Sequence, residues 1–166
     1  MPMKSLAKAF VEELKDVHSA EKQITHALPK MAKAATHEAL RAAFEEHLEQ
    51  THQQIERLEK VFASIDRATD SKHCQAMAGI IEEGSALLQE DAAPDVKDAM
   101  MIQSAQKVEH YEIAAYGTLC AWSELLGYSE ANHLLNQTLT EEKQTDEKLT
   151  ELAQQVVNRD ALREAA

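Results

Sequence analysis

Acidic side chains interrupt the apolar stripe of the segment 102–120, where an amphipathic helix would carry aliphatic residues. At about 100° per residue, Glu109 lies within about 40° of Ile102 and Tyr116, and Glu112 lies about 60° away. Burying an ionised carboxylate without a partner costs many kcal/mol, softened in practice by a shift of its pKa. Carboxylates that face a core therefore need cations, and hard oxygen ligands of this kind suit iron or manganese.

Two further segments repeat this pattern. Glu142 lies within about 40° of Leu149 on one helical face, Asp146 follows it one turn later, and Glu21 lies within about 40° of Val17. No lysine or arginine is expected on these stripes near the acids. Because several carboxylates facing one core cannot all ionise without positive charge between them, divalent metal is the simplest source of that charge.

The segment 37–65 offers a nitrogen ligand in the pattern E-x-x-H, formed by Glu49 and His52. Di-metal sites in helical bundles take a Glu from each of two helices and Glu-x-x-His from the other two. The fit here requires a rotation of the helix, because His52 lies about 80° and Glu49 about 140° from Phe44, the centre of the apolar stripe. His47, on the opposite flank, is expected to be a buried, hydrogen-bonded histidine.

The predicted cofactor is a pair of metal ions, with iron first and manganese or zinc as alternatives. The predicted ligands are Glu21, Glu49, His52, Glu109, Glu112, Glu142 and Asp146. Fully ionised, these six carboxylates carry a charge of −6, which two divalent ions reduce to about −2 and two trivalent ions to about zero. The alternative is that the acids pair with core histidines or water and bind no metal. Tyr116 either hydrogen-bonds a ligand carboxylate or takes part in one-electron chemistry, or it is an ordinary core tyrosine.

Hydrophobic spacing predicts four long helices and one short one that follows the polar loop 66–74. The long helices are expected at about 5–35, 37–65, 95–126 and 129–158. Thr36 and Ser129 are the predicted N-caps, Pro29 is expected to kink the first helix near its end, and Gly127 should end the third. Helices of this length and order predict an all-α four-helix bundle as a single domain, 1–166. The long link between the second and third helices favours the ferritin-like crossover, although an up-down bundle with a decorated loop also fits.

The composition of the chain limits the kinds of binding partner and the cellular location that can be expected. The 166 residues carry a net charge of −12, which argues against nucleic acid and anionic membranes as partners. No apolar run approaches the roughly 18 residues of a membrane span, and the first ten residues lack the pattern of a signal peptide. A cytoplasmic location is therefore expected, with both cysteines, Cys74 and Cys120, reduced.

The ligand pattern resembles rubrerythrin, a ferritin-like di-iron protein with one Glu on its first helix, E-x-x-H on the second, E-x-x-E on the third and E-x-x-x-H on the fourth. Asp146 stands where that pattern has histidine. The chain also resembles the YciF/YciE-like family of bacterial stress-associated proteins. The phrases that carry this second resemblance are SAEKQITHAL (19–28), HLEQTHQQIERL (47–58), QKVEHYEIAAYGTL (106–119) and EEKQTD (141–146).

These resemblances imply a ferritin-like bundle, a homodimer and a cytoplasmic role linked to stress. The reaction they suggest is reduction of peroxide or O₂ at a di-metal centre. The chain has no C-x-x-C pair of the kind that carries rubrerythrin's own electron donor, so turnover would need a separate electron donor. The alternatives are a protein that sequesters metal without turnover and a purely structural dimer.

Overall fold

The computed structural model describes residues 4–163, and within them every regular element is a helix. The elements are α1 (Leu6–Ala34), α2 (Glu38–Ser64), α3 (Gln75–Gln89), α4 (Pro94–Leu125), α5 (Ser129–Leu152), a π-helical turn (Ala153–Val157) and α6 (Asn158–Arg163). The last predicted helix thus ends earlier as α-helix, and a π-helical turn joins it to α6. None of the helices described is both long enough and apolar enough to cross a membrane.

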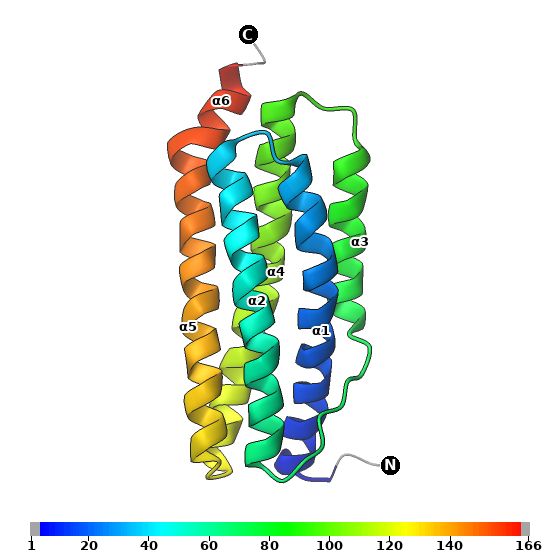
Figure 1. Ribbon diagram of the computed structural model, residues 1–166, viewed down its shortest axis with the longest axis vertical. Coiled ribbons are helices and arrows are strands. Elements are labelled where there is room, and N and C mark those ends of the chain that lie inside the picture. The colour runs from blue at the N-terminus through cyan, green and yellow to red at the C-terminus, as the bar shows by residue number, and fades with distance from the viewer. Residues whose placement is uncertain (1–3, 164–166) are drawn as a thin grey trace.

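The four long helices form a bundle with a crossover (Figure 1). α1 packs against α2 and α4, and α5 packs against the same two helices, so α2 and α4 stand on one diagonal. The link from α2 travels back along the bundle as α3 before α4 begins, so α2 and α4 run parallel (Figure 1). An up-down bundle would make them antiparallel, so the ferritin-like crossover is confirmed. α3 packs outside the bundle, against α1 and α4.

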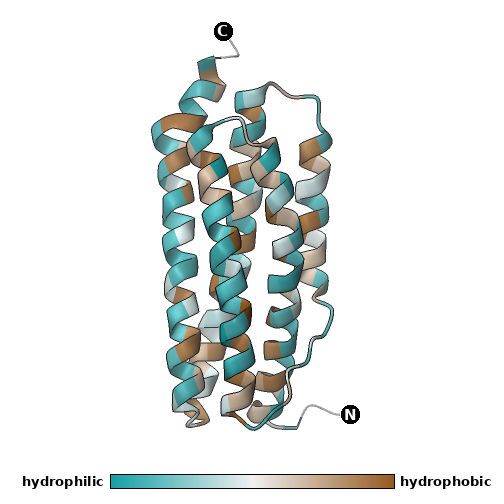
Figure 2. Cartoon of the chain, in the orientation of Figure 1, coloured by the Kyte–Doolittle hydropathy of each residue, from teal (hydrophilic) through white to brown (hydrophobic). Residues whose placement is uncertain are grey.

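Two apolar clusters fill the bundle, and a polar layer divides them. Bands of hydrophobic residues recur along each helix among hydrophilic ones (Figure 2). α1 contributes Val17 to one cluster and Ile24 to the other, with buried Glu21 between them. The same change of cluster occurs on α2 between Phe44 and Leu58, and on α4 and α5 on either side of their buried acids. All four helices therefore place polar side chains at one level of the bundle.

The helix ends differ in part from the predicted caps. Gly127 follows α4 with φ +72°, as expected for the residue after a helix. Ser129 is the first residue of α5 and makes no capping bond there, and the side chain of Thr36 does not cap α2. Asp98 of α4 instead fixes the turn before α2, because its carboxylate accepts the backbone N–H groups of Thr36 at 3.0 Å and His37 at 2.7 Å. A local sequence pattern could not show this contact because its acceptor is distant in the chain.

Replacing Asp98 by alanine should lower the free energy of unfolding by about 2–3 kcal/mol, because two backbone donors lose a charged acceptor in a buried site. Urea unfolding followed by circular dichroism measures this loss. Asp98→Asn, which keeps one acceptor oxygen, should lose less. Equal stability of the alanine variant and the parent protein would show that water satisfies these donors.

Candidate metal centre

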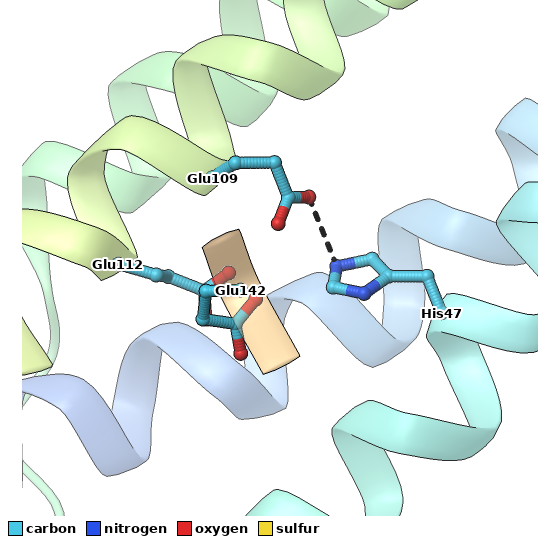
Figure 3. Close-up of side chains that lie close together, drawn as sticks. All are labelled: His47, Glu109, Glu112 and Glu142. Atoms are coloured by element: carbon cyan, nitrogen blue, oxygen red, sulfur yellow. Dashed lines mark ion pairs between the residues drawn. The ribbon is translucent and has the colours of Figure 1, made fainter. Parts of the chain in front are cut away.

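The polar layer contains a tight group of four side chains. His47 comes from α2, Glu109 and Glu112 from α4, and Glu142 from α5, and one ligand atom of each lies within 4.8 Å of the others. Their side chains point toward one another in the middle of the bundle (Figure 3). All four are buried, with 4% of His47 exposed and 1% or less of each glutamate.

Glu21 adjoins this group from α1. It is fully buried, and the Tyr116 hydroxyl of α4 donates a hydrogen bond to its Oε1. Tyr116 thus has a satisfied hydroxyl whose partner is a predicted ligand, which is the first of the two roles expected for it. The second oxygen of Glu21 has no hydrogen-bond partner. Tyr116 holds the Glu21 carboxylate in place and leaves one oxygen free.

Most of the buried oxygens in this layer lack hydrogen bonds to the described residues. Both oxygens of Glu112 and of Glu142 have no partner, and neither has Oε2 of Glu109. Nε2 of His47 lies 3.2 Å from Oε1 of Glu109, but the two are not aligned for a hydrogen bond, so both ring nitrogens of His47 remain unpartnered. An unsatisfied buried polar group costs about 1–3 kcal/mol, and more if charged. These donor atoms fit a metal, because a cation would satisfy all of them at once.

The electrostatics of the layer point the same way. Burial, followed by the charge of Glu142, raises the pKa of Glu21, Glu109 and Glu112 well above the usual range. Burial also raises the pKa of Glu142 from 4.5 to about 7. Burial lowers the pKa of His47 to about 4, so its imidazole is neutral at pH 7 and keeps a lone pair for a metal.

One cation near the layer was not expected from the sequence. Arg57 of α2 is buried, with 8% exposed. Its guanidinium binds both carboxylate oxygens of Glu141 at 2.8 and 2.9 Å and the hydroxyl of Thr138 at 2.7 Å. The expectation that no cation lies on the stripes of Glu21, Glu109 and Glu142 is not contradicted, because Arg57 belongs to α2. Because Glu141 already balances its charge, Arg57 does not neutralise the four buried glutamates.

The structure does not bring Glu49 and His52 to this centre. Both side chains are exposed on α2, and Glu49 accepts a hydrogen bond from Gln53 at 3.3 Å. The inward positions of α2 at this level are His47, Thr51 and Gln54 instead. The rotation that the E-x-x-H pair required is absent, because the helix buries the face that continues its apolar stripe.

Asp146 also lies outside the four-residue group. Its Oδ1 accepts a hydrogen bond from Gln106 at 3.1 Å, and its Oδ2 lies 3.2 Å from Nε2 of His110, an exposed side chain. Asp146 therefore pairs with the outer side of α4. Without Glu49 and Asp146, the buried acids are Glu21, Glu109, Glu112 and Glu142, which carry −4 when ionised.

His47, the nitrogen donor that the predicted ligand set did not include, belongs to the buried stripe of α2. His47 lies three residues after Phe44 and continues, with Thr51 and Gln54, the i, i+3, i+4 spacing that leads to Leu58. The expectation that His47 is buried is confirmed, but its ring nitrogens have no hydrogen-bond partner, and the sequence did not mark it as a ligand. The E-x-x-H spacing pointed to Glu49 and His52 instead because it matched a known motif.

The crossover bundle with carboxylates and a histidine buried between its helices defines a protein of the ferritin-like class. The chain belongs to the family described as a domain of unknown function, DUF892, which matches residues 5–162. Protein YciF of Escherichia coli K12 is 49% identical over 162 residues, 97% of this chain and 98% of that protein.

Solved structures agree with this assignment. The crystal structure of the Escherichia coli stress protein YciF matches with a TM-score of 0.90 at 49% identity, over 94% of this chain and 99% of that one. YcfI from Rhodopseudomonas palustris, for which a structural role has been suggested, matches with a TM-score of 0.87 at 41% identity, over 89% and 94%. A protein from Xanthomonas campestris shares the fold alone, with a TM-score of 0.78 at 20% identity over 98% and 100%.

Proposed function

We propose that the protein is a ferritin-like di-metal protein of the stress response that binds two iron ions through Glu21, His47, Glu109, Glu112 and Glu142. The observation that carries this proposal is the set of buried carboxylate oxygens with no hydrogen-bond donor. The charges support it as well. Four ionised glutamates carry about −4, His47 is neutral, and two divalent ions balance that charge completely.

The donor set favours iron or manganese over softer metals. Four carboxylates and one imidazole make an oxygen-rich site that suits iron or manganese, whereas zinc sites are built mainly from histidine and cysteine and copper(I) sites from thiolate or thioether. The two buried cysteines stand elsewhere: Cys74 caps α3, and Cys120 packs in the apolar cluster of the other half of the bundle. The zinc alternative therefore has less support than iron.

The bound pair of ions would supply two electrons, which with two protons reduce hydrogen peroxide to two molecules of water. The protein's own residues orient the ligands and exclude water. Tyr116 fixes Glu21, and the Arg57–Glu141 pair ties α2 to α5 next to Glu142. The apolar clusters above and below the layer limit its contact with water, which strengthens the electrostatic interactions in it. The electrons would come from a separate donor, since the chain has no C-x-x-C pair.

Elemental analysis of protein purified without chelator tests the ligand set. The parent protein should hold about two ions per chain, the number of a ferritin-like di-metal site. The metal content of Glu109→Ala and of His47→Ala should each fall by about one ion or more, because each substitution removes a side chain that coordinates the metal. Glu49→Ala and His52→Ala are matched controls on the exposed face of α2 and should keep the parent content. Loss of metal in these controls, or full content in Glu109→Ala, would refute the assignment.

Stopped-flow spectroscopy separates turnover from storage. Ferrous protein mixed with peroxide or with O₂ should develop the absorbance of ferric iron. A protein that sequesters metal would hold iron and show no such change with either oxidant. The structural role suggested for YcfI corresponds to a third hypothesis, a helical bundle that binds no metal. Elemental analysis that finds no metal in the parent protein would support this hypothesis.

A further inference from the structure

Two cavities reach the His47–Glu109 pair from different sides of the bundle. The first, of about 90 Å³, lies between α1, α3 and α4, and the second, of about 100 Å³, lies between α2 and α5. Both are lined by His47, Glu109 and Ala105. The dashed line in Figure 3 joins His47 and Glu109, the two side chains at the inner ends of both cavities.

The walls of the two cavities differ in chemistry. The first, called here the apolar cavity, is lined mainly by aliphatic side chains, among them Ile24, Leu28, Ile80, Ile81, Leu88 and Val108. Exposed residues, including His26 and Ser85, border its outer end. The second, called here the polar cavity, is lined by Glu46, Gln50, Gln144, Thr145 and Lys148, with Glu46 and Lys148 forming an ion pair.

We propose that the apolar cavity binds a small, neutral, weakly polar molecule of the size of dioxygen and presents it to the metal centre. This inference rests on the proposed function and names the substrate class of the same site. A cavity of about 150 Å³ with aliphatic walls stays dry and holds benzene or xenon. The apolar cavity is smaller, at about 90 Å³, so it suits a molecule of a few atoms.

Polarity decides between the two oxidants. Moving a group that hydrogen-bonds water into an aliphatic site costs free energy unless its bonds are replaced. Peroxide donates two hydrogen bonds and accepts several, and the wall offers partners at Gln23, at Ser104 and at the two ends of the cavity but is aliphatic elsewhere. Dioxygen makes almost none and loses little on leaving water. The polar cavity, with its amides and hydroxyl, is the better route for peroxide, water and ions.

The crossover helix builds the apolar cavity. α3 supplies Ile80, Ile81 and Leu88, and it lies close to α4, where a Cβ on Gly84 would collide with the Ser104 hydroxyl. The glycine lets α3 approach α4 at this point. A four-helix bundle without α3 would lack the outer wall of the cavity.

Xenon diffraction tests the site without any metal. A crystal of the parent protein under xenon pressure should show an anomalous peak in the apolar cavity. Ala27→Leu fills this cavity from α1 and should remove the peak, whereas Ala43→Leu adds the same volume to the polar cavity and should keep it. Ile81→Phe, on α3 outside the four-helix core, provides a second filling variant if Ala27→Leu does not fold. No peak in the parent protein would overturn the proposal.

Oxidation kinetics test the role of the site. In ferrous protein, Ala27→Leu should slow oxidation by O₂ at least about tenfold and leave oxidation by peroxide near the parent rate. Ala43→Leu should leave the O₂ rate unchanged. Equal O₂ rates in Ala27→Leu and the parent would overturn the proposal even if xenon binds. Xenon in the cavity of a protein that binds no metal would support the binding site and refute the proposed function alone.

Discussion

Saturating the metal-free protein with ferrous or manganous ion under anaerobic conditions should raise its melting temperature by at least about 8 °C. A ligand that binds only the folded state at about 1,000 times its Kd adds about 4 kcal/mol. For a domain of 150–250 residues, each kcal/mol raises the melting temperature by about 2–4 °C. One occupied site therefore predicts about 8–16 °C, and the second ion adds to it. Differential scanning calorimetry with and without chelator measures the difference.

The reason for so large an effect is that the metal-free protein folds around four buried acids, most of whose oxygens lack hydrogen-bond partners. The buried glutamates gain their counter-charge only when cations bind. Glu109→Ala should therefore show a smaller metal-dependent shift than the parent protein, while Glu49→Ala should show the full shift. If neither ferrous nor manganous ion changes the melting temperature of the parent protein, the buried carboxylates are neutralised by protons alone.

The stability of the metal-free protein should fall as the pH rises from about 5 to 8. A carboxyl whose pKa is higher in the folded state than in the unfolded state holds its proton more tightly when folded. Its contribution to stability is complete below the unfolded value of 4.5 and is lost as the pH rises through the folded value, about 7 for Glu142. The change for Glu142 alone corresponds to about 3 kcal/mol.

Urea unfolding of the metal-free protein at several pH values measures this loss. The pKa values of Glu21, Glu109 and Glu112 are raised in the same direction, so the loss should continue above pH 7. Glu112→Gln removes one buried charge and should make the metal-free protein more stable than the parent at pH 8 while impairing metal binding. Metal-loaded parent protein should show a flatter profile, because bound cations keep the acids ionised at all these pH values. A flat profile without metal would contradict the prediction.

If Glu112→Gln makes the metal-free protein more stable and weakens metal binding, the polar layer serves function and not stability. A core designed only for stability would carry leucine at Glu21, Glu109, Glu112 and Glu142, since each position lies between apolar clusters. The cost of burying charge there is offset only if something binds. This trade between stability and function is typical of sites that evolution has kept for chemistry.

The sequence by itself determined the helices, their order and the acids of the centre. Glu21, Glu109, Glu112 and Glu142 were found because a buried carboxylate contradicts the period of its own helix, and that contradiction is local. The length of one link favoured the crossover but left an up-down bundle open, and the parallel course of α2 and α4 in the structure (Figure 1) decided between them. The residue after α4, Gly127, was also predictable, since a glycine suits a positive φ.

Only the tertiary structure decided which side of α2 faces the centre. His47 and His52 stand at comparable angles on either side of Phe44, so the rotation of α2 depends on its packing against α1 and α5. The same holds for Asp146, which lies on the line of Glu142 but pairs with Gln106 and His110 of α4. The hydrophobic spacing of one helix allows several rotations about its axis. Packing against the neighbouring helices fixes one of them, so the rotation cannot be predicted from that spacing alone.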